Sequence, residues 1–177
     1  LYWFGQIARP REVSIDNNIL IQKPVRELEQ CRKNKVIYEK QLVEGLLKLE
    51  QIEGRVIDMT LNLGWKENEC YKFEMNFAED ENYKTVLSFR PRESLLEIDR
   101  KYSGSRREIC HQACCKVKKV ENLKLRIILD LYSAEVFVNG GEQVLTTTFY
   151  TPLSAKGISF NIDGKISLDV EKYDLDL

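Results

Sequence analysis

The stretch "SAEVFVNGGEQVLTTTFYTP", Ser133 to Pro152, predicts a β-hairpin. Val136 and Val138 alternate with Glu135 and Phe137, and an extended pattern resumes at Val144. Between the two runs, Asn139-Gly140 provides the positive φ angles that a tight hairpin turn requires. The hairpin is well specified, yet it contains no nucleophile, ligand set or phosphate-binding loop. Its function therefore has to be inferred from the rest of the sequence.

Two further hairpins are predicted, "EVSIDNNILIQ" from Glu12 and "GISFNIDGKISLDV" from Gly157, the second turning at Asp163-Gly164. Other runs alternate apolar and polar residues, so that one side of each faces a core. Many short strands that end at turn signals favour an all-β fold, a two-sheet antiparallel β-sandwich that is jelly-roll-like. A short helix is predicted near residues 25–32, and residues 39–52 fit either a helix or a strand.

Composition narrows the class of protein. The 27 basic and 28 acidic residues nearly cancel, which argues against a nucleic-acid partner. No apolar run approaches the roughly 20 residues that cross a bilayer, so no membrane partner is expected. Five cysteines, an odd number, and the absence of an Asn-x-Ser/Thr sequon favour reduced thiols and a cytoplasmic location.

Carboxylates are plentiful, but most lie at the polar positions of alternating strands and are interpreted as a solvated face; other side chains with catalytic or metal-binding chemistry are few. Cys110, His111, Cys114 and Cys115 resemble a zinc ligand set, but residues four apart on a strand are separated by about 13 Å and the two Cys-x-x-Cys pairs of common zinc sites are missing. The favoured interpretation is half-buried thiols on a strand, and a solvent-facing histidine. The basic loop that follows Tyr102 is interpreted as a surface turn. The sequence therefore predicts no catalytic residue, no metal and no cofactor.

Three stretches resemble glycoside hydrolase family 32, the β-fructosidases and invertases. The first, Trp3 to Leu28, is similar to the segment that joins the two domains of those enzymes, with Pro-Arg-Glu, a hairpin and Gln-x-Pro-Val-x-Glu-Leu in order. The second, Ser133 to Glu142, resembles the family's Ser-Val-Glu-Ile-Phe-Val-Asn-x-Gly-Glu run. The third is "LLEIDRKYSG", Leu95 to Gly104. The wording of the first most resembles bacterial sucrose or sucrose-6-phosphate hydrolases.

This resemblance implies a catalytic five-bladed propeller followed by a β-sandwich, with this chain as the sandwich. The sequence has no Asp-Pro pair, so the two family motifs that carry the catalytic aspartates are absent. Glu69-Cys70 matches the acid/base glutamate motif only by chance, because it lies between two predicted sandwich strands. Residues 1–9 are interpreted as a remnant of the propeller and linker, and 10–177 as the C-terminal sandwich. The expected propeller contacts are Tyr2, Trp3, Phe4 and Gln6.

Two functions remain open. The first is an accessory sandwich that packs on the N-terminal catalytic propeller of the same polypeptide, stabilises it and possesses no activity alone. A small sugar substrate would then be reached only through that domain, and a homo-oligomer is compatible with this role. The alternative is a carbohydrate-binding module that binds fructan or another glycan itself, for which exposed aromatic residues are required. Its candidate residues are Tyr132, Phe137, Phe149 and Tyr150.

Overall fold

The computed structural model describes residues 8–104, 112–118 and 121–177, and these are almost entirely β-structure. Two short 3₁₀ helices, η1 (Arg26–Cys31) and η2 (Pro91–Glu93), interrupt the strands. The strands are β1 (Arg11–Asp16), β2 (Ile19–Pro24), β3 (Arg32–Leu47), β4 (Ile57–Gly64), β5 (Cys70–Glu79), β6 (Thr85–Arg90), β7 (Leu95–Asp99), β8 (Gln112–Lys116), β9 (Asn122–Asp130), β10 (Ser133–Val138), β11 (Gln143–Thr148) and β12 (Gly157–Leu175). Within these residues no helix is long and apolar enough to span a membrane.

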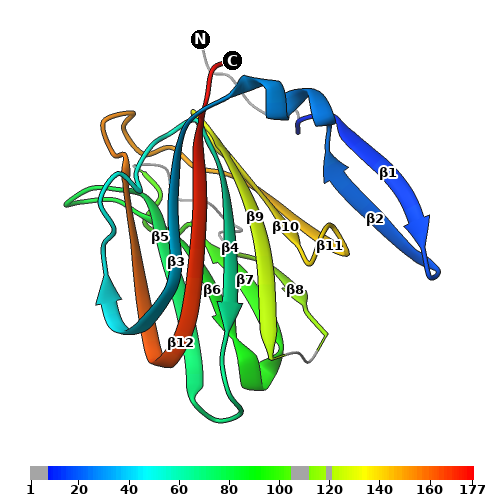
Figure 1. Cartoon of the computed structure of the whole chain (residues 1–177). Helices are drawn as coiled ribbons and strands as arrows, with labels where there is room; N and C mark the ends of the chain where they lie inside the picture. The colour runs from blue at the N-terminus through cyan, green and yellow to red at the C-terminus, as the bar shows by residue number, and fades with distance from the viewer. Residues whose placement is uncertain (1–7, 105–111, 119–120) are drawn as a thin grey trace.

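Strands β3 to β12 form one antiparallel sheet that folds over into two facing layers (Figure 1). Its order is β11-β10-β9-β4-β12-β5-β6-β7-β8, and β3 pairs with the other edge of β12. Strands β1 and β2 form a separate two-stranded sheet that extends away from the two layers. The prediction of an all-β sandwich is confirmed.

The long strand β12 joins the two layers. Its first part, Gly157 to Gly164, pairs with β5, and its last part, from Ser167 to Asp174, pairs with β4. The predicted hairpin turn at Asp163-Gly164 is therefore wrong: the chain bends there and continues in the same strand, which pairs with β3 on both sides of the bend. A glycine with positive φ after an aspartate occurs in hairpin turns and also in bulges of a continuous strand. Only the positions of the partner strands distinguish a turn from a bulge.

The main core lies between the layers. The side chains at alternate positions of β4 and β9 are buried, as the alternation predicted, and they meet aromatic residues from the other layer. Phe73 packs against Phe160 with ring centroids 6.2 Å apart, and Phe77 packs edge-on against Phe149 at 5.6 Å. This burial supplies the main stabilising term of the fold.

A second, smaller core lies on the outer face of β9 and β10. Leu28 of η1 covers Ile128 and Phe137 there, and Leu175 completes the cluster. The predicted helix near residues 25–32 is confirmed in position and is a 3₁₀ helix. The uncertain segment 39–52 continues β3 as far as Leu47, because β12 offers it a full-length hydrogen-bonding partner.

Candidate functional site

The three stretches that carry the family resemblance meet at the β10–β11 hairpin. The linker stretch contributes Arg11, whose Nε and Nη2 donate to Oε2 of Glu135 at 2.9 and 2.6 Å. The third stretch contributes Arg100, whose Nη1 donates to Oγ1 of Thr148 at 2.9 Å. The backbone N–H of Tyr150 also donates to the Ser103 carbonyl at 2.7 Å. The β10–β11 hairpin is thus the part of the sandwich to which the other two stretches are bound.

Glu135 is the anchor for the linker. Its side chain is buried, and Oε1 accepts the backbone N–H of Arg9 at 2.9 Å in addition to the two bonds from Arg11. The Arg9 guanidinium pairs with Asp130 at 2.7 Å. Charge-assisted hydrogen bonds of this kind are about twice as strong as neutral ones, and a buried carboxylate without them would be costly. The path of the chain from residue 9 to residue 11 is therefore fixed on the start of β10.

A second contact holds the returning strand of the linker hairpin. The backbone N–H of Gln22 donates to the carbonyl of Gly141 at 3.0 Å. Gly141 has φ +107°, and a Cβ on it would overlap the Gln22 carbonyl. The close approach of the two backbones therefore requires glycine at this position.

Gly141→Ala is expected to weaken the contact between β2 and the β10–β11 turn, because it adds backbone strain of about 1–3 kcal/mol and a steric overlap. Limited proteolysis is expected to cleave the variant more rapidly near Leu20 than the parent chain. Gly140→Ala is the matched control, since Gly140 also has positive φ but nothing lies within 4 Å of its added Cβ. Equal cleavage rates for the two variants would contradict this role of Gly141.

Beside the small core, Asp58 is held between two arginines. Its Oδ2 accepts from Nε of Arg32 at 2.9 Å and from Nη2 of Arg126 at 2.8 Å, and its side chain is 1% exposed. Burial opposes the charge of Arg126, but the hydrogen bonds and charges of Asp58 and Glu29 raise its pKa on balance. The guanidinium of Arg32 also lies 4.6 Å from the ring centroid of Tyr173.

Asp58 alternates with the inward-facing Ile57 and Met59, a position at which alternation alone leads us to expect a solvated carboxylate. That expectation is wrong for this residue, because η1 and the two arginines cover the outer face of β4 at this point. No local signal reveals it: alternation assigns the face, and only the folding of the linker over that face decides whether water reaches it.

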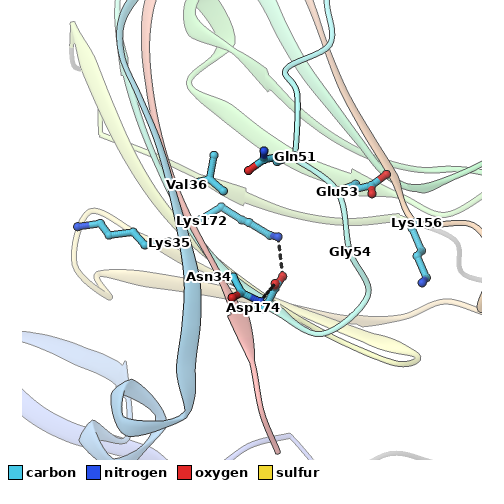
Figure 2. Close-up of a pocket in the computed structure, with 9 residues that line it drawn as sticks. All are labelled: Asn34, Lys35, Val36, Gln51, Glu53, Gly54, Lys156, Lys172 and Asp174. Atoms are coloured by element: carbon cyan, nitrogen blue, oxygen red, sulfur yellow. Dashed lines mark hydrogen bonds and ion pairs between the residues drawn. The ribbon is translucent and has the colours of Figure 1, made fainter.

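A polar cavity of about 580 Å³ lies between β3, the end of β12 and the segment that follows β3 (Figure 2). Nζ of Lys172 approaches Oδ1 of Asp174 at 2.5 Å, and Nδ2 of Asn34 donates to Oδ2 at 2.9 Å. Gln51, Glu53 and Lys156 line the other side.

The chemistry of this cavity differs from that of a glycosidase. A general acid needs a carboxyl group whose pKa is raised. Burial alone would raise the pKa of Asp174, but the hydrogen bonds from Lys172 and Asn34 lower it below its usual value. Asp174 is therefore suited to holding the Lys172 ammonium in place, and not to protonating a leaving group.

The other predicted residues fall in several places. Tyr2, Trp3, Phe4 and Gln6 lie outside the described residues, as do Cys110 and His111. Cys114 and Cys115 are neighbours on β8 and so point to opposite faces; Cys114 is exposed and Cys115 half-buried. No group of three or more potential metal ligands occurs within the described parts of the chain.

Glu69-Cys70 lies where the sequence placed it, at the junction of the β4–β5 connection and β5. Burial raises the pKa of the Cys70 thiol to about 11, which leaves it protonated and unreactive at neutral pH. Glu69 itself is exposed, and its carbonyl accepts the backbone N–H of Lys165 at 2.8 Å.

The four aromatic candidates for glycan stacking differ in their exposure to solvent. Phe137 belongs to the small core and Phe149 to the main core, so neither presents a ring to solvent. Tyr132 is exposed and Tyr150 is half-buried.

Sequence reasoning missed Arg55, which is buried at the end of the sandwich. Its Nη1 donates to Oγ1 of Thr151 at 2.5 Å and to the Ala155 carbonyl at 3.1 Å, and Nη2 donates to the Leu131 carbonyl. The guanidinium also lies 4.7 Å from the ring centroid of Phe149. Burial lowers the pKa of Arg55. These contacts tie three loops together, and a lone arginine in a connecting segment gives no sequence signal of them.

Comparison with known proteins agrees with this architecture. Residues 27–175 match the family model described as glycosyl hydrolases family 32 C terminal. A sucrose-6-phosphate hydrolase from Staphylococcus xylosus is 27% identical over 175 residues, which are 98% of this chain and 35% of that protein. A sucrose-6-phosphate hydrolase from Bacillus subtilis is 26% identical over 172 residues, 96% of this chain and 33% of its own length. The chain thus spans about a third of the length of these relatives.

Solved structures share the fold. The sucrose-6-phosphate hydrolase from Lactobacillus gasseri superposes with a TM-score of 0.77 at 20% identity, over 94% of this chain and 33% of that one. The exo-inulinase from Aspergillus awamori gives 0.79 at 17% identity, over 96% of this chain and 35% of that one. With the family model matching most of its length, this chain belongs to the family of C-terminal domains of family 32 glycosyl hydrolases.

Proposed function

We propose that this chain is the accessory sandwich of a β-fructofuranosidase-type hydrolase, and that it packs on and stabilises a preceding catalytic domain. This proposal rests on the match to a C-terminal family model. It also rests on the alignment to sucrose-6-phosphate hydrolases, of whose length this chain spans about a third. In it, residues 1–9 lead out of the catalytic domain and 10–177 form the accessory domain. The complete enzyme hydrolyses sucrose 6-phosphate or sucrose.

The arrangement of the linker supports a stabilising role. Arg9 and Arg11 are hydrogen-bonded to Glu135, so the end of the segment that would connect the two domains is bound to the sandwich. A linker that is held at its sandwich end restricts how far the two domains move relative to each other. The four described cysteines are free thiols, which supports a cytoplasmic location for the enzyme.

The experiment compares the full-length polypeptide with a version that lacks residues 10–177. Deletion is expected to lower the melting temperature and the rate of sucrose 6-phosphate hydrolysis, because it exposes the surface on which the sandwich packs. The 177-residue chain alone is expected to hydrolyse neither sugar. Hydrolysis by the isolated chain, or an unchanged enzyme after the deletion, would contradict the proposal.

Direct glycan binding is the second candidate, with Tyr132 as its exposed aromatic residue. Of the four candidate rings only Tyr132 is exposed, which is less than the stacking platform that polymer binding uses. Titration of the 177-residue chain with inulin or levan is expected to give no saturable binding in the sub-millimolar range. Saturable binding that Tyr132→Ala abolishes would instead favour the binding module.

A further inference from the structure

Strand β3 leaves one of its edges open. It runs over 16 residues, and among the described residues β12 is the only strand with which it pairs. Figure 1 shows these two strands side by side along the sandwich. A strand edge without a neighbour presents a row of unpaired N–H and C=O groups, which are a template for pairing with another strand. The far edge of β3 can therefore accept a further strand.

The outward face of this edge carries apolar side chains. Ile37 and Leu42 are 48% and 76% exposed. Their partners on β12, Glu171 and Ser167, lie four residues apart, so the two apolar side chains point to the same face although a bulge separates them. Exposed apolar residues along an unpaired edge favour association with another strand.

The sequence of this edge complements itself when two copies run in opposite directions. Residues 35–44 read "KVIYEKQLVE", and the reversed segment matches it in charge and polarity. The pairs are Lys35–Glu44, Val36–Val43, Ile37–Leu42, Tyr38–Gln41 and Glu39–Lys40. Opposite charges, or apolar side chains, that face each other across antiparallel strands are stabilising. A second copy of this chain therefore provides a matched partner for this edge.

The charges also select the register. A slip of one residue in one direction places Lys40 opposite Lys40 of the second copy, and a slip in the other direction places Glu39 opposite Glu39. Like charges directly opposite each other are destabilising. The register that pairs Lys35 with Glu44 avoids both. The Lys35 ammonium lies 2.6 Å from a carboxylate oxygen of Glu171, yet its side chain is still 47% exposed, so a second carboxylate can reach it.

The bulge in β3 fits a two-fold axis. The register with β12 shifts at Glu39 and Lys40, where Lys40 has φ +52° and its N–H donates to Oδ1 of Asp169 at 2.8 Å. A bulge increases the local twist of a strand. In the matched register Glu39 and Lys40 face each other across the two copies, so both edges twist at the same point. Asn34 and Gly45, which also have positive φ, lie at the two ends of the matched segment.

We propose that two copies of this chain form a symmetric dimer through β3. The two strands pair antiparallel, with Lys35 opposite Glu44 and Ile37 opposite Leu42, and the sheet of one sandwich continues into that of the other. Such an interface uses the same patch on both subunits, as two-fold symmetry requires. The pairing covers the open backbone edge and the exposed apolar side chains together.

Charge substitutions at this edge test the dimer in the full-length polypeptide. Lys35→Glu and Glu44→Lys are each expected to weaken dimerisation about tenfold or more, because each places like charges opposite one another twice in a symmetric dimer. Lys33→Glu is the matched control, since Lys33 also forms an exposed ion pair on β3, with Asp176, but lies outside the matched segment. Sedimentation over a range of concentrations measures the dissociation constant of the dimer, which the control is expected to leave unchanged.

A mixture of the two single variants provides a second measurement. Equimolar Lys35→Glu and Glu44→Lys polypeptides are expected to form a mixed dimer with a dissociation constant close to that of the parent, because opposite charges then face each other at both positions. A folding defect in either variant does not produce recovery on mixing. A parent polypeptide that stays monomeric up to sub-millimolar concentration would overturn the proposal, and so would a dimer that both single variants leave intact. A mixture that dimerises no better than its two components would overturn the register.

Discussion

Gly164→Ala is expected to cost about 3 kcal/mol or more of unfolding free energy, because the added methyl group meets both backbone strain and a steric overlap. Gly164 has φ +106°, a conformation that side chains rarely adopt. A Cβ there would overlap the Glu69 carbonyl, and the atoms it meets are backbone, which cannot turn aside. The substitution acts at the point where β12 leaves one layer and enters the other.

Gly45→Ala is the control for Gly164, because it tests positive φ without a steric neighbour. Gly45 has φ +72° on β3, beside the same bend, and nothing lies within 4 Å of its added Cβ. Its substitution is expected to cost about 1 kcal/mol from backbone strain alone. Urea unfolding of the 177-residue chain, followed by tryptophan fluorescence, measures both. Similar losses for the two variants would show that the Glu69 contact does not decide the bend.

Asp58→Ala is expected to cost about 3–5 kcal/mol, because it leaves Arg32 and Arg126 facing each other with their shared anion removed. Both arginine side chains are 21% exposed, so water restores only part of the stabilisation that they lose. The small core beneath η1 is expected to loosen as well, since Arg32 directly follows η1 in the chain. The unfolding midpoint in urea measures the change.

Asp176→Ala provides the matched control for Asp58. Asp176 also forms an ion pair, with Lys33, but both side chains are well exposed, and exposed pairs contribute little. Its midpoint is expected to stay unchanged. Combining Asp58→Ala with Arg126→Met is expected to recover part of the stability, because one of the two opposed charges is removed. If the loss of unfolding free energy in the double variant exceeds the sum of the losses in the two single variants, repulsion between the two arginines is not the cause of the Asp58→Ala effect.

Much of the fold was predictable because alternation is a local property. The buried positions of β4 and β9, and the hairpins at Asn139-Gly140 and after Asp16, follow from which side chains face a core and which residues adopt turn angles. The turn predicted at Asp163-Gly164 failed for the same reason. Local sequence marks a break in the strand, but not whether the chain reverses there or changes its partner.

The candidate site was less predictable, because it depends on contacts between distant residues. Arg11 and Glu135 are separated by 124 positions and are joined only when the linker folds over β10. The resemblance identified both stretches, but not that one anchors the other. Arg55 and Asp58 are single charged residues in otherwise unremarkable segments, and burial of each is decided by loops and arginines elsewhere in the chain.

The sequence by itself determined most of the strands, their inward faces and the family, since each depends on the order of neighbouring residues. Tertiary structure alone decided that β12 bridges two layers, that Asp58 is shielded from water, and that β3, among the described residues, pairs along one edge only. The physical reason is that solvent exposure and charge pairing belong to the folded surface as a whole. Residues far apart in the chain create that surface together, and alternation within one strand contains no record of them.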